Sequence, residues 1–397
     1  MKILHYKDVI NRPLLSDRAL LVTVAVIVAF GLVMLSSSTL AIADKQHGDP
    51  FYYLFRQTIY IALGCLFAFS ALFIKTEFWR KSSGLLLVFG LVLLVCVLVP
   101  FIGKEVGGAV RWISVAGFQF QASELVKLII VIYLASYMVR HQVTVRESYL
   151  GLLRILVVLG LVSVLLLLEP DYGATVVIFA TAMAMMFIGG AKIWQCAVVA
   201  IGTGAIFAAL IWTSSYRLER WASFLNPWAD RYDSGFQLTQ ALIAFGRGEW
   251  FGVGLGAGMQ KLFYLPEVHT DFIYSVLAEE LGVAGAACVI ALFLVLIWRA
   301  FSIARQANQC GKVYASYLSY GIGTLIGLQA LVNIGVNTGV LPTKGLTLPL
   351  VSYGGSSIVV TLFMVGILLR VSYEVNLATA KKSVAVKKKP SRRREKS

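Results

Sequence analysis

The sequence predicts an all-α integral membrane protein of about ten transmembrane helices with both termini in the cytoplasm. Of its 397 residues, 58% are hydrophobic and only 14% are charged, whereas a soluble domain carries roughly 25% charged residues. Apolar stretches of about 20 residues, the length that crosses the hydrocarbon core of a bilayer, recur along the whole chain. These observations exclude an ordinary soluble protein, a disordered chain and a secreted protein held together by disulfides.

We predict the ten transmembrane helices from the length of the apolar runs. They cover residues 18–41, 52–74, 84–102, 122–140, 151–168, 172–190, 192–213, 271–299, 314–340 and 351–373. The fifth and sixth runs are separated only by Glu169-Pro170-Asp171. Because proline breaks helices and two carboxylates are costly in lipid, these three residues predict a turn at the membrane surface.

The distribution of Lys and Arg predicts the orientation of the helices. Most of the 35 Lys and Arg residues lie in segments on the same side as the N-terminus, which the positive-inside rule places in the cytoplasm. We therefore divide the chain into a cytoplasmic segment (1–18), a membrane domain (19–374) and a basic cytoplasmic tail (375–397). The long segment 214–270 then lies on the extracytoplasmic side, and its aromatic residues favour the membrane interface.

Charge and cysteine usage limit the kinds of partner. The formal net charge is +15, but nine of the basic residues lie in the tail between Lys381 and Lys396, and no folded basic module accompanies them. Such a tail favours contact with anionic membrane lipids, so no nucleic-acid partner is predicted. The five cysteines have no C-x-x-C spacing and the chain has only four histidines, so the sequence predicts neither a disulfide nor a zinc framework.

Charged residues inside apolar stretches are the main functional candidates, because each needs a partner, a water-filled cavity or a function. Glu124 and Lys127 are three positions apart on the predicted fourth helix, so they can pair on one face. The pair either locks two helices together or forms a charged cavity wall, and the sequence leaves both interpretations open. Arg111 lies beside Trp112 in the preceding loop, where an indole anchors at the interface and a cation can meet an anionic headgroup.

Polar residues at the start of the eighth helix include Asp271, the strongest candidate for a catalytic residue. Thr270 is the predicted helix N-cap, and an acid in the first helical turn is stabilised by the macrodipole, which lowers its pKa. A general base at neutral pH instead benefits from a raised pKa, which burial and neighbouring Glu residues provide. The sequence does not decide which effect is larger. Glu280 follows on the same helix.

A lone lysine, Lys344, stands in the glycine- and serine-rich segment 341–357 between the last two helices. Its charge suits a phosphate of a lipid substrate, and the glycines and hydroxyls of the segment, among them Ser352, offer further donors. The alternative interpretation is a lysine that snorkels to the membrane surface beside a glycine-rich helix start.

With these motifs identified, the chain resembles the SEDS family, the polytopic peptidoglycan glycosyltransferases, over about residues 19–374. The resemblance rests on segments 107–127, 169–173, 265–282 and 342–357. It is closer to the cell-division members of the family than to the elongation members. Two residues depart from the family pattern, because Gly107 stands where a polar residue is usual and Ala122 stands where proline is usual.

The resemblance implies ten transmembrane helices and an activity, the polymerisation of lipid II into glycan strands at the outer face of the bacterial cytoplasmic membrane. It places the family's essential aspartate at Asp271, as the expected general base, with undecaprenyl pyrophosphate as the leaving group. The family positions that lie near the expected cavity, with substrate-binding roles, are Arg111, Glu124, Lys127, Glu280, Lys344 and Ser352.

The resemblance also implies partners. A class B penicillin-binding protein transpeptidase would cross-link the growing glycan strand, acting with the chain and other division proteins at the septum. No cofactor is required by the motifs, and a divalent cation, Mg²⁺ or Mn²⁺, remains open at the pyrophosphate. Two other functions remain open from the sequence: a lipid II flippase that uses the same intramembrane charges, and a division scaffold whose charges only pack helices.

Overall fold

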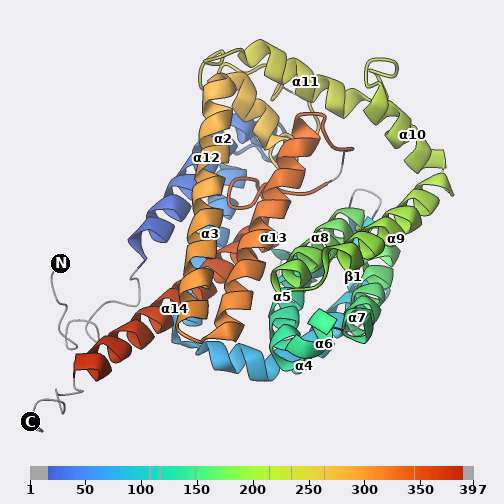
Figure 1. The fold of residues 1–397 in the computed structure, drawn as a ribbon. Helices are drawn as coiled ribbons and strands as arrows, with labels where there is room; N and C mark the ends of the chain where they lie inside the picture. Colours follow the sequence, from blue (N-terminus) through green and yellow to red (C-terminus); the bar gives the residue numbers. More distant parts are fainter. Residues whose placement is uncertain are drawn as a thin grey trace, which may run out of the picture.

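A computed structural model describes residues 17–106, 109–115, 118–147, 149–213, 215–233, 235–262, 264–343 and 345–387. Over these residues the chain forms a bundle of long helices (Figure 1), which confirms the predicted helical membrane-protein class. In this part of the chain, eight helices are long and apolar enough to cross a membrane. Two further apolar helices, those from Tyr172 and from Ile193, are shorter.

Helices α2 (Arg18–His47), α3 (Tyr52–Phe73) and α4 (Thr76–Leu98) come first, followed by strands β1 (Gly103–Val106), β2 (Ala109–Val115) and β3 (Phe118–Gln121). The middle of the chain forms α5 (Ala122–Arg140), α6 (Gln142–Glu147), α7 (Tyr149–Leu168), α8 (Tyr172–Ile188) and α9 (Ile193–Trp212). The remaining helices are α10 (Ser215–Leu225), α11 (Phe236–Gly248), α12 (Ile273–Gln309), α13 (Val313–Asn337) and α14 (Gly355–Lys387).

Each of the ten predicted helices overlaps one helix of the structure, but several predicted ends are wrong. The third helix begins at Thr76 rather than near residue 84, and the eighth continues to Gln309 rather than ending near 299. The last helix continues to Lys387, so the first half of the predicted tail is helical. Apolar length marks only the part of a helix that lies in hydrocarbon, and polar residues extend these helices beyond it.

The segment between α4 and α5 forms a small sheet that the sequence analysis did not predict. Its three strands pair as an antiparallel meander in the order β1-β2-β3, with Trp112 opposite Gln121. The backbone N–H of Gln121 donates to Oγ of Ser356 at 2.8 Å, which ties the sheet to the start of α14. Strands of 4 to 7 residues contain too few alternations to give a clear periodic signal.

Helices α3 and α14 pack closely where small residues let their backbones approach. A Cβ added to Gly366 of α14 would lie 2.4 Å from the carbonyl oxygen of Ala68 in α3. On the same interface, Gly64 of α3 packs against the side chain of Leu362. Small residues at such crossings are the usual means of helix association in a membrane, where apolar burial alone gives little driving force.

Helix α12 is interrupted at Gly282, whose φ of 68° and ψ of −169° are not helical. The loop that follows α11 lies against the interruption and satisfies the backbone groups that it frees. The amide of Val253 donates to the carbonyl of Glu279 at 3.0 Å, and the amide of Val283 donates to the carbonyl of Glu249 at 2.9 Å. An interrupted helix is tolerated at membrane depth where protein supplies these partners.

Candidate functional site

Asp271 lies just before α12, and its side chain is partly buried. The backbone carbonyl of Asp271 accepts hydrogen bonds from Nδ2 of Asn333 (2.9 Å) and Nδ2 of Asn337 (2.8 Å), both on α13. Its carboxylate lies close to Gly345, where an added Cβ would be 2.9 Å from Oδ2. Asp271 therefore sits between the start of α12, the end of α13 and the segment that joins α13 to α14.

Burial raises the pKa of Asp271 to about 7, and the charges of Glu267 and Asp171 also raise it, while Arg111 lowers it. The sequence left open whether the helix macrodipole or burial has the larger effect on this pKa. In the structure α12 begins at Ile273, so Asp271 precedes the first helical turn. Burial has the larger effect, and the carboxyl group titrates near neutral pH.

The predicted N-cap at Thr270 is wrong. Its hydroxyl donates to Oε2 of Glu267 at 2.7 Å instead of accepting from an amide of the helix. Phe272 occupies the N-cap position and makes no side-chain capping bond. The cap prediction failed because it assumed that the helix starts at residue 271, whereas Asp271 and Phe272 still belong to the preceding turn.

Arg111 lies on β2 and holds the predicted turn between α7 and α8. Its Nε donates to the carbonyl of Glu169 at 3.2 Å, and its Nη2 donates to the carbonyl of Pro170 at 2.6 Å. Next to them Asp171 caps α8, because its Oδ1 accepts the amide of Ala174 at 3.1 Å. The turn predicted from these residues is confirmed, and it brings a cation to the same end of the bundle as Asp271.

Glu169 is a buried carboxylate that the sequence analysis assigned only to the turn. It is 0% exposed, and among the described residues neither of its carboxylate oxygens has a hydrogen-bond partner. Burial raises its pKa to about 8, the charge of Asp171 raises it further and Arg111 lowers it. Glu169 is therefore largely protonated at neutral pH, and the signal for it in the sequence was a second carboxylate beside a proline.

The predicted pairing of Glu124 and Lys127 is confirmed. Nζ of Lys127 lies 2.8 Å from Oε1 of Glu124, and both side chains are almost fully buried. The same Nζ donates to Oε1 of Gln329 on α13 at 3.1 Å, and Nε2 of Gln329 donates to the carbonyl of Thr347 at 3.5 Å. The pair therefore links α5 through α13 to the segment that lies beside Asp271.

Ser352 forms hydrogen bonds that stabilise the segment between α13 and α14. Its Oγ accepts the amide of Leu348 at 2.8 Å, and its carbonyl accepts Nε2 of Gln57 from α3 at 3.1 Å. Ser352 is 3% exposed, so its hydroxyl is committed to the turn. Lys344 and Gly107 lie outside the described residues.

Glu280 belongs to a separate buried network on α12. Its carboxylate accepts from Nζ of Lys261 (2.7 Å), the amide of Gly256 (3.0 Å) and the hydroxyl of Ser37 on α2. None of these partners is another predicted site residue, so its predicted role toward substrate stays a prediction. Lys261 was not identified from the sequence, because nothing local distinguishes a lysine in an extracytoplasmic loop from one that pairs inside the bundle.

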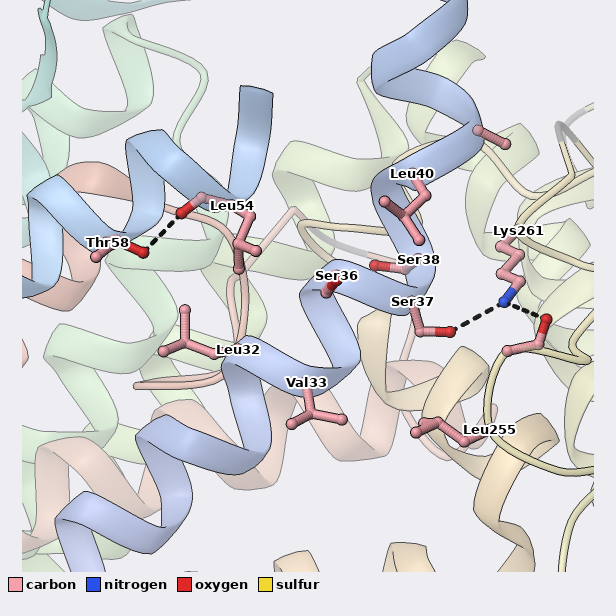
Figure 2. Close-up of a pocket in the computed structure, with 12 residues that line it drawn as sticks. Leu32, Val33, Ser36, Ser37, Ser38, Leu40, Leu54, Thr58, Leu255 and Lys261 are labelled. Carbon is pink, nitrogen blue, oxygen red and sulfur yellow. Dashed lines mark hydrogen bonds between the residues drawn. The ribbon is translucent and has the colours of Figure 1, made fainter. Parts of the chain in front are cut away.

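A cavity of about 800 Å³ lies beside this network, between α2, α3 and the loop after α11. Figure 2 shows Lys261 reaching Ser37 at one edge of the cavity, whose remaining walls are mostly apolar. Because Nζ of Lys261 already donates to Ser37, Gly256 and Glu280, its charge is neutralised within the protein.

The described residues do not provide a site for the divalent cation that the sequence left open. Within that part of the chain, no group of three or more His, Cys, Asp or Glu side chains is placed to hold a metal ion. Asp171, the acid nearest in sequence to Glu169, is instead bound by the hydroxyl of Ser123 at 2.8 Å and by the amide of Ala174.

The arrangement around Asp271 is suited to proton transfer. A carboxyl group with a pKa near 7 exists in both protonation states at neutral pH, which is the property of an efficient general base. Arg111 supplies positive charge to the same end of the bundle, where an anionic leaving group can be stabilised. A hydroxyl group attacking an electrophile beside Asp271 would lose its proton to this carboxylate.

Comparisons with known proteins identify relatives of this chain. The model of the FtsW/RodA/SpoVE family, described as cell cycle proteins, matches residues 17–377. The probable peptidoglycan glycosyltransferase FtsW of Nitrosococcus halophilus is 52% identical over 369 residues, which are 93% of this chain and 95% of the relative.

Solved structures share the fold. A chain from a peptidoglycan synthase complex, studied for its coordination of polymerization and crosslinking, has a TM-score of 0.76 at 30% identity and covers 90% of this chain and 98% of its own. The rod shape determining protein RodA of Thermus thermophilus has a TM-score of 0.65 at 28% identity, covering 90% and 96% of the two chains.

Proposed function

Because the chain belongs to the FtsW/RodA/SpoVE family of cell cycle proteins, we propose that it is a peptidoglycan glycosyltransferase that polymerises lipid II into glycan strands during septal cell-wall synthesis. The names of its relatives support the activity, and FtsW relatives at about 50% identity support the role in division rather than elongation. A flippase or a scaffold remains an alternative, but no observation favours either.

The observation that best supports this proposal is the partly buried carboxylate of Asp271. As the general base it accepts the proton of the acceptor sugar's 4-hydroxyl while that oxygen forms a bond to the anomeric carbon of the donor. The bond from the anomeric carbon to the pyrophosphate oxygen breaks, and undecaprenyl pyrophosphate leaves with the electron pair. A pKa of about 7 supports this role, because the base is then partly ionised at the pH at which it works.

Positive charge near the leaving group is the second requirement of the reaction. Negative charge develops on the pyrophosphate in the transition state, and fixed cations are most useful there. Arg111 is the described cation whose charge acts on Asp271, and Lys344 is a further candidate from the sequence. No step is assigned to Mg²⁺ or Mn²⁺, because the acidic side chains of the described residues do not converge on an ion.

A class B penicillin-binding protein is the proposed partner that cross-links the new strand. The structural relative from a peptidoglycan synthase complex supports such a partner. The excess of basic residues on the N-terminal side supports an active site on the outer side of the cytoplasmic membrane. The other proposed partners are the growing strand, membrane lipids and further division proteins.

Polymerisation of purified lipid II by the protein together with its cognate transpeptidase tests this function. We expect Asp271→Asn to lower the polymerisation rate by roughly 10²- to 10⁴-fold, the usual contribution of a general base. Asp233→Asn is the matched control, because Asp233 is an exposed acid of the same extracytoplasmic segment. A near-normal rate for Asp271→Asn would refute the base, and transfer of labelled lipid II between leaflets without lengthening would indicate a flippase.

A further inference from the structure

We propose that Asn333 and Asn337 are positioning residues that hold the Asp271 carboxylate in its working place, an inference that rests on the function proposed above. The two asparagines are one helical turn apart on α13, and they are 1% and 0% exposed. Nδ2 of each donates to the backbone carbonyl of Asp271, at 2.9 and 2.8 Å. Two buried amides therefore converge on one carbonyl oxygen.

Each asparagine also binds a second segment. Nδ2 of Asn333 donates to the carbonyl of Leu346 at 2.5 Å, in the segment that follows α13. Oδ1 of Asn337 accepts both the amide (3.1 Å) and the hydroxyl (2.7 Å) of Ser275 in the first turn of α12. The asparagine pair thus joins α13, the start of α12 and the segment beside the carboxylate.

The start of α12 receives a side-chain hydrogen bond from α13. Phe272 is its N-cap residue and makes no side-chain capping bond, although its backbone carbonyl accepts the amide of Ser275 at 3.0 Å. Oδ1 of Asn337 accepts the same amide at 3.1 Å, so a side chain of α13 supplies the cap that the loop residue lacks. The interruption at Gly282 separates this first part of α12 from the long remainder of the helix. The position of Asp271 therefore depends more on α13 than on the rest of α12.

The contacts hold the backbone of Asp271 and leave its carboxylate open. Among the described residues, none donates a hydrogen bond to either carboxylate oxygen, whereas the backbone carbonyl accepts two. On the other side of the loop, the amide of Tyr353 donates to the carbonyl of His269 at 2.8 Å. Because its backbone is held in place, the Asp271 carboxylate is positioned for proton transfer. Its carboxylate oxygens remain able to accept a proton from a substrate.

Two variants test whether the asparagines position Asp271 or only stabilise the fold. Asn333→Ala removes a donor to Asp271 and leaves the Asn337 cap on Ser275 in place. Asn337→Asp keeps an oxygen for Ser275 but removes the Nδ2 donor to Asp271. Asn308→Ala, at an exposed position near the end of α12, is the matched control.

The experiment measures steady-state polymerisation of lipid II by the full chain with its cognate transpeptidase, across a range of pH. We expect kcat to fall roughly 10- to 100-fold in both variants, with KM for lipid II within about threefold of the unmodified value, because small misplacements of a reacting group cost this much. In Asn333→Ala the acidic limb of the pH profile should also move to lower pH, since a loosened Asp271 is better hydrated.

A purely structural role would instead lower the amount of folded protein without moving the pH profile, and thermal unfolding measured alongside identifies that outcome. Unchanged kcat and pH profile in both variants, with Asp271→Asn inactive, would overturn the positioning role and leave the proposed function intact. Activity in Asp271→Asn would overturn the proposed base itself.

Discussion

At the scale of single residues, burial decides the chemistry of Asp271. Its sequence position next to a helix start suggests an acid of lowered pKa, since a helix N-terminus favours the charged form. In the structure desolvation dominates and the pKa rises to about 7. Glu169 follows the same rule, because it is buried, no described residue hydrogen-bonds its carboxylate, and its pKa rises to about 8. Two carboxyl groups at one end of the bundle therefore titrate near neutral pH.

The pH dependence of polymerisation follows from the pKa of Asp271. A general base works as the carboxylate, so activity should be lost as pH falls through about 7 and should rise toward a plateau above it. Glu267→Gln removes a negative charge that raises this pKa, so it should move the acidic limb to lower pH. Rates of lipid II polymerisation between pH 5.5 and 9 provide the measurement. A limb that stays in place in Glu267→Gln would contradict the assignment of the limb to Asp271.

At the scale of elements, the interruption of α12 is the main departure from regular structure. The loop after α11 supplies hydrogen bonds to the freed backbone groups, and Glu279 and Glu280 bind the same loop through their side chains. Oε1 of Glu279 accepts the amide of Met259 at 3.0 Å. The interruption therefore couples the start of the helix that follows Asp271 to the loop after α11.

Substitution of Gly282 tests this coupling. Its φ of 68° disfavours any residue with a Cβ, and an added Cβ would lie 2.4 Å from the backbone nitrogen of Gly252. We expect Gly282→Ala to lower the stability by at least about 1–3 kcal/mol, the usual cost of such backbone strain. Gly202→Ala, on α9 with open space around it, should be neutral or stabilise by about 0.5–1 kcal/mol. Thermal unfolding in lipid nanodiscs compares them, and equal midpoints would contradict a required left-handed residue at 282.

At the scale of the whole molecule, Asp271 and Arg111 lie at one end of the helices. A cluster of hydrogen bonds around Glu374 lies at the other end. Arg111 binds the turn at Pro170, and its charge acts on Asp271, so these three residues lie at the same end of the helices. At the opposite end, Glu374 of α14 accepts from the amide and hydroxyl of Thr76 and from Nζ of Lys312. This carboxylate joins the turns that precede α4 and α13 to the last helix.

Membrane orientation is the prediction that belongs to this scale. In a chain whose native cysteines are replaced by serine, Tyr232→Cys should react with a membrane-impermeant maleimide in intact cells. Tyr232 is 79% exposed in the predicted extracytoplasmic segment. Asn308→Cys, at the opposite end of α12, should react only after the membrane is opened, because the positive-inside rule places it in the cytoplasm. The reverse pattern of labelling would invert the predicted topology and place Asp271 on the cytoplasmic side.

The sequence by itself determined the features that depend on residues close together in the chain. Apolar length was enough to locate the ten predicted helices, because crossing a bilayer imposes a minimum span on every one. The pairing of Glu124 with Lys127 followed from their spacing of three residues on one helix. The turn at Glu169 and Asp171 followed from proline chemistry, and motif resemblance identified the family and pointed to Asp271.

Only the tertiary structure decided which groups surround these residues. Burial by distant segments set the pKa of Asp271, and two asparagines more than 60 residues away bound its carbonyl. The same holds for Glu280, whose partner Ser37 lies 243 residues away in the chain. Desolvation and hydrogen bonding depend on the distance between atoms in space, and neither composition nor periodicity contains that distance.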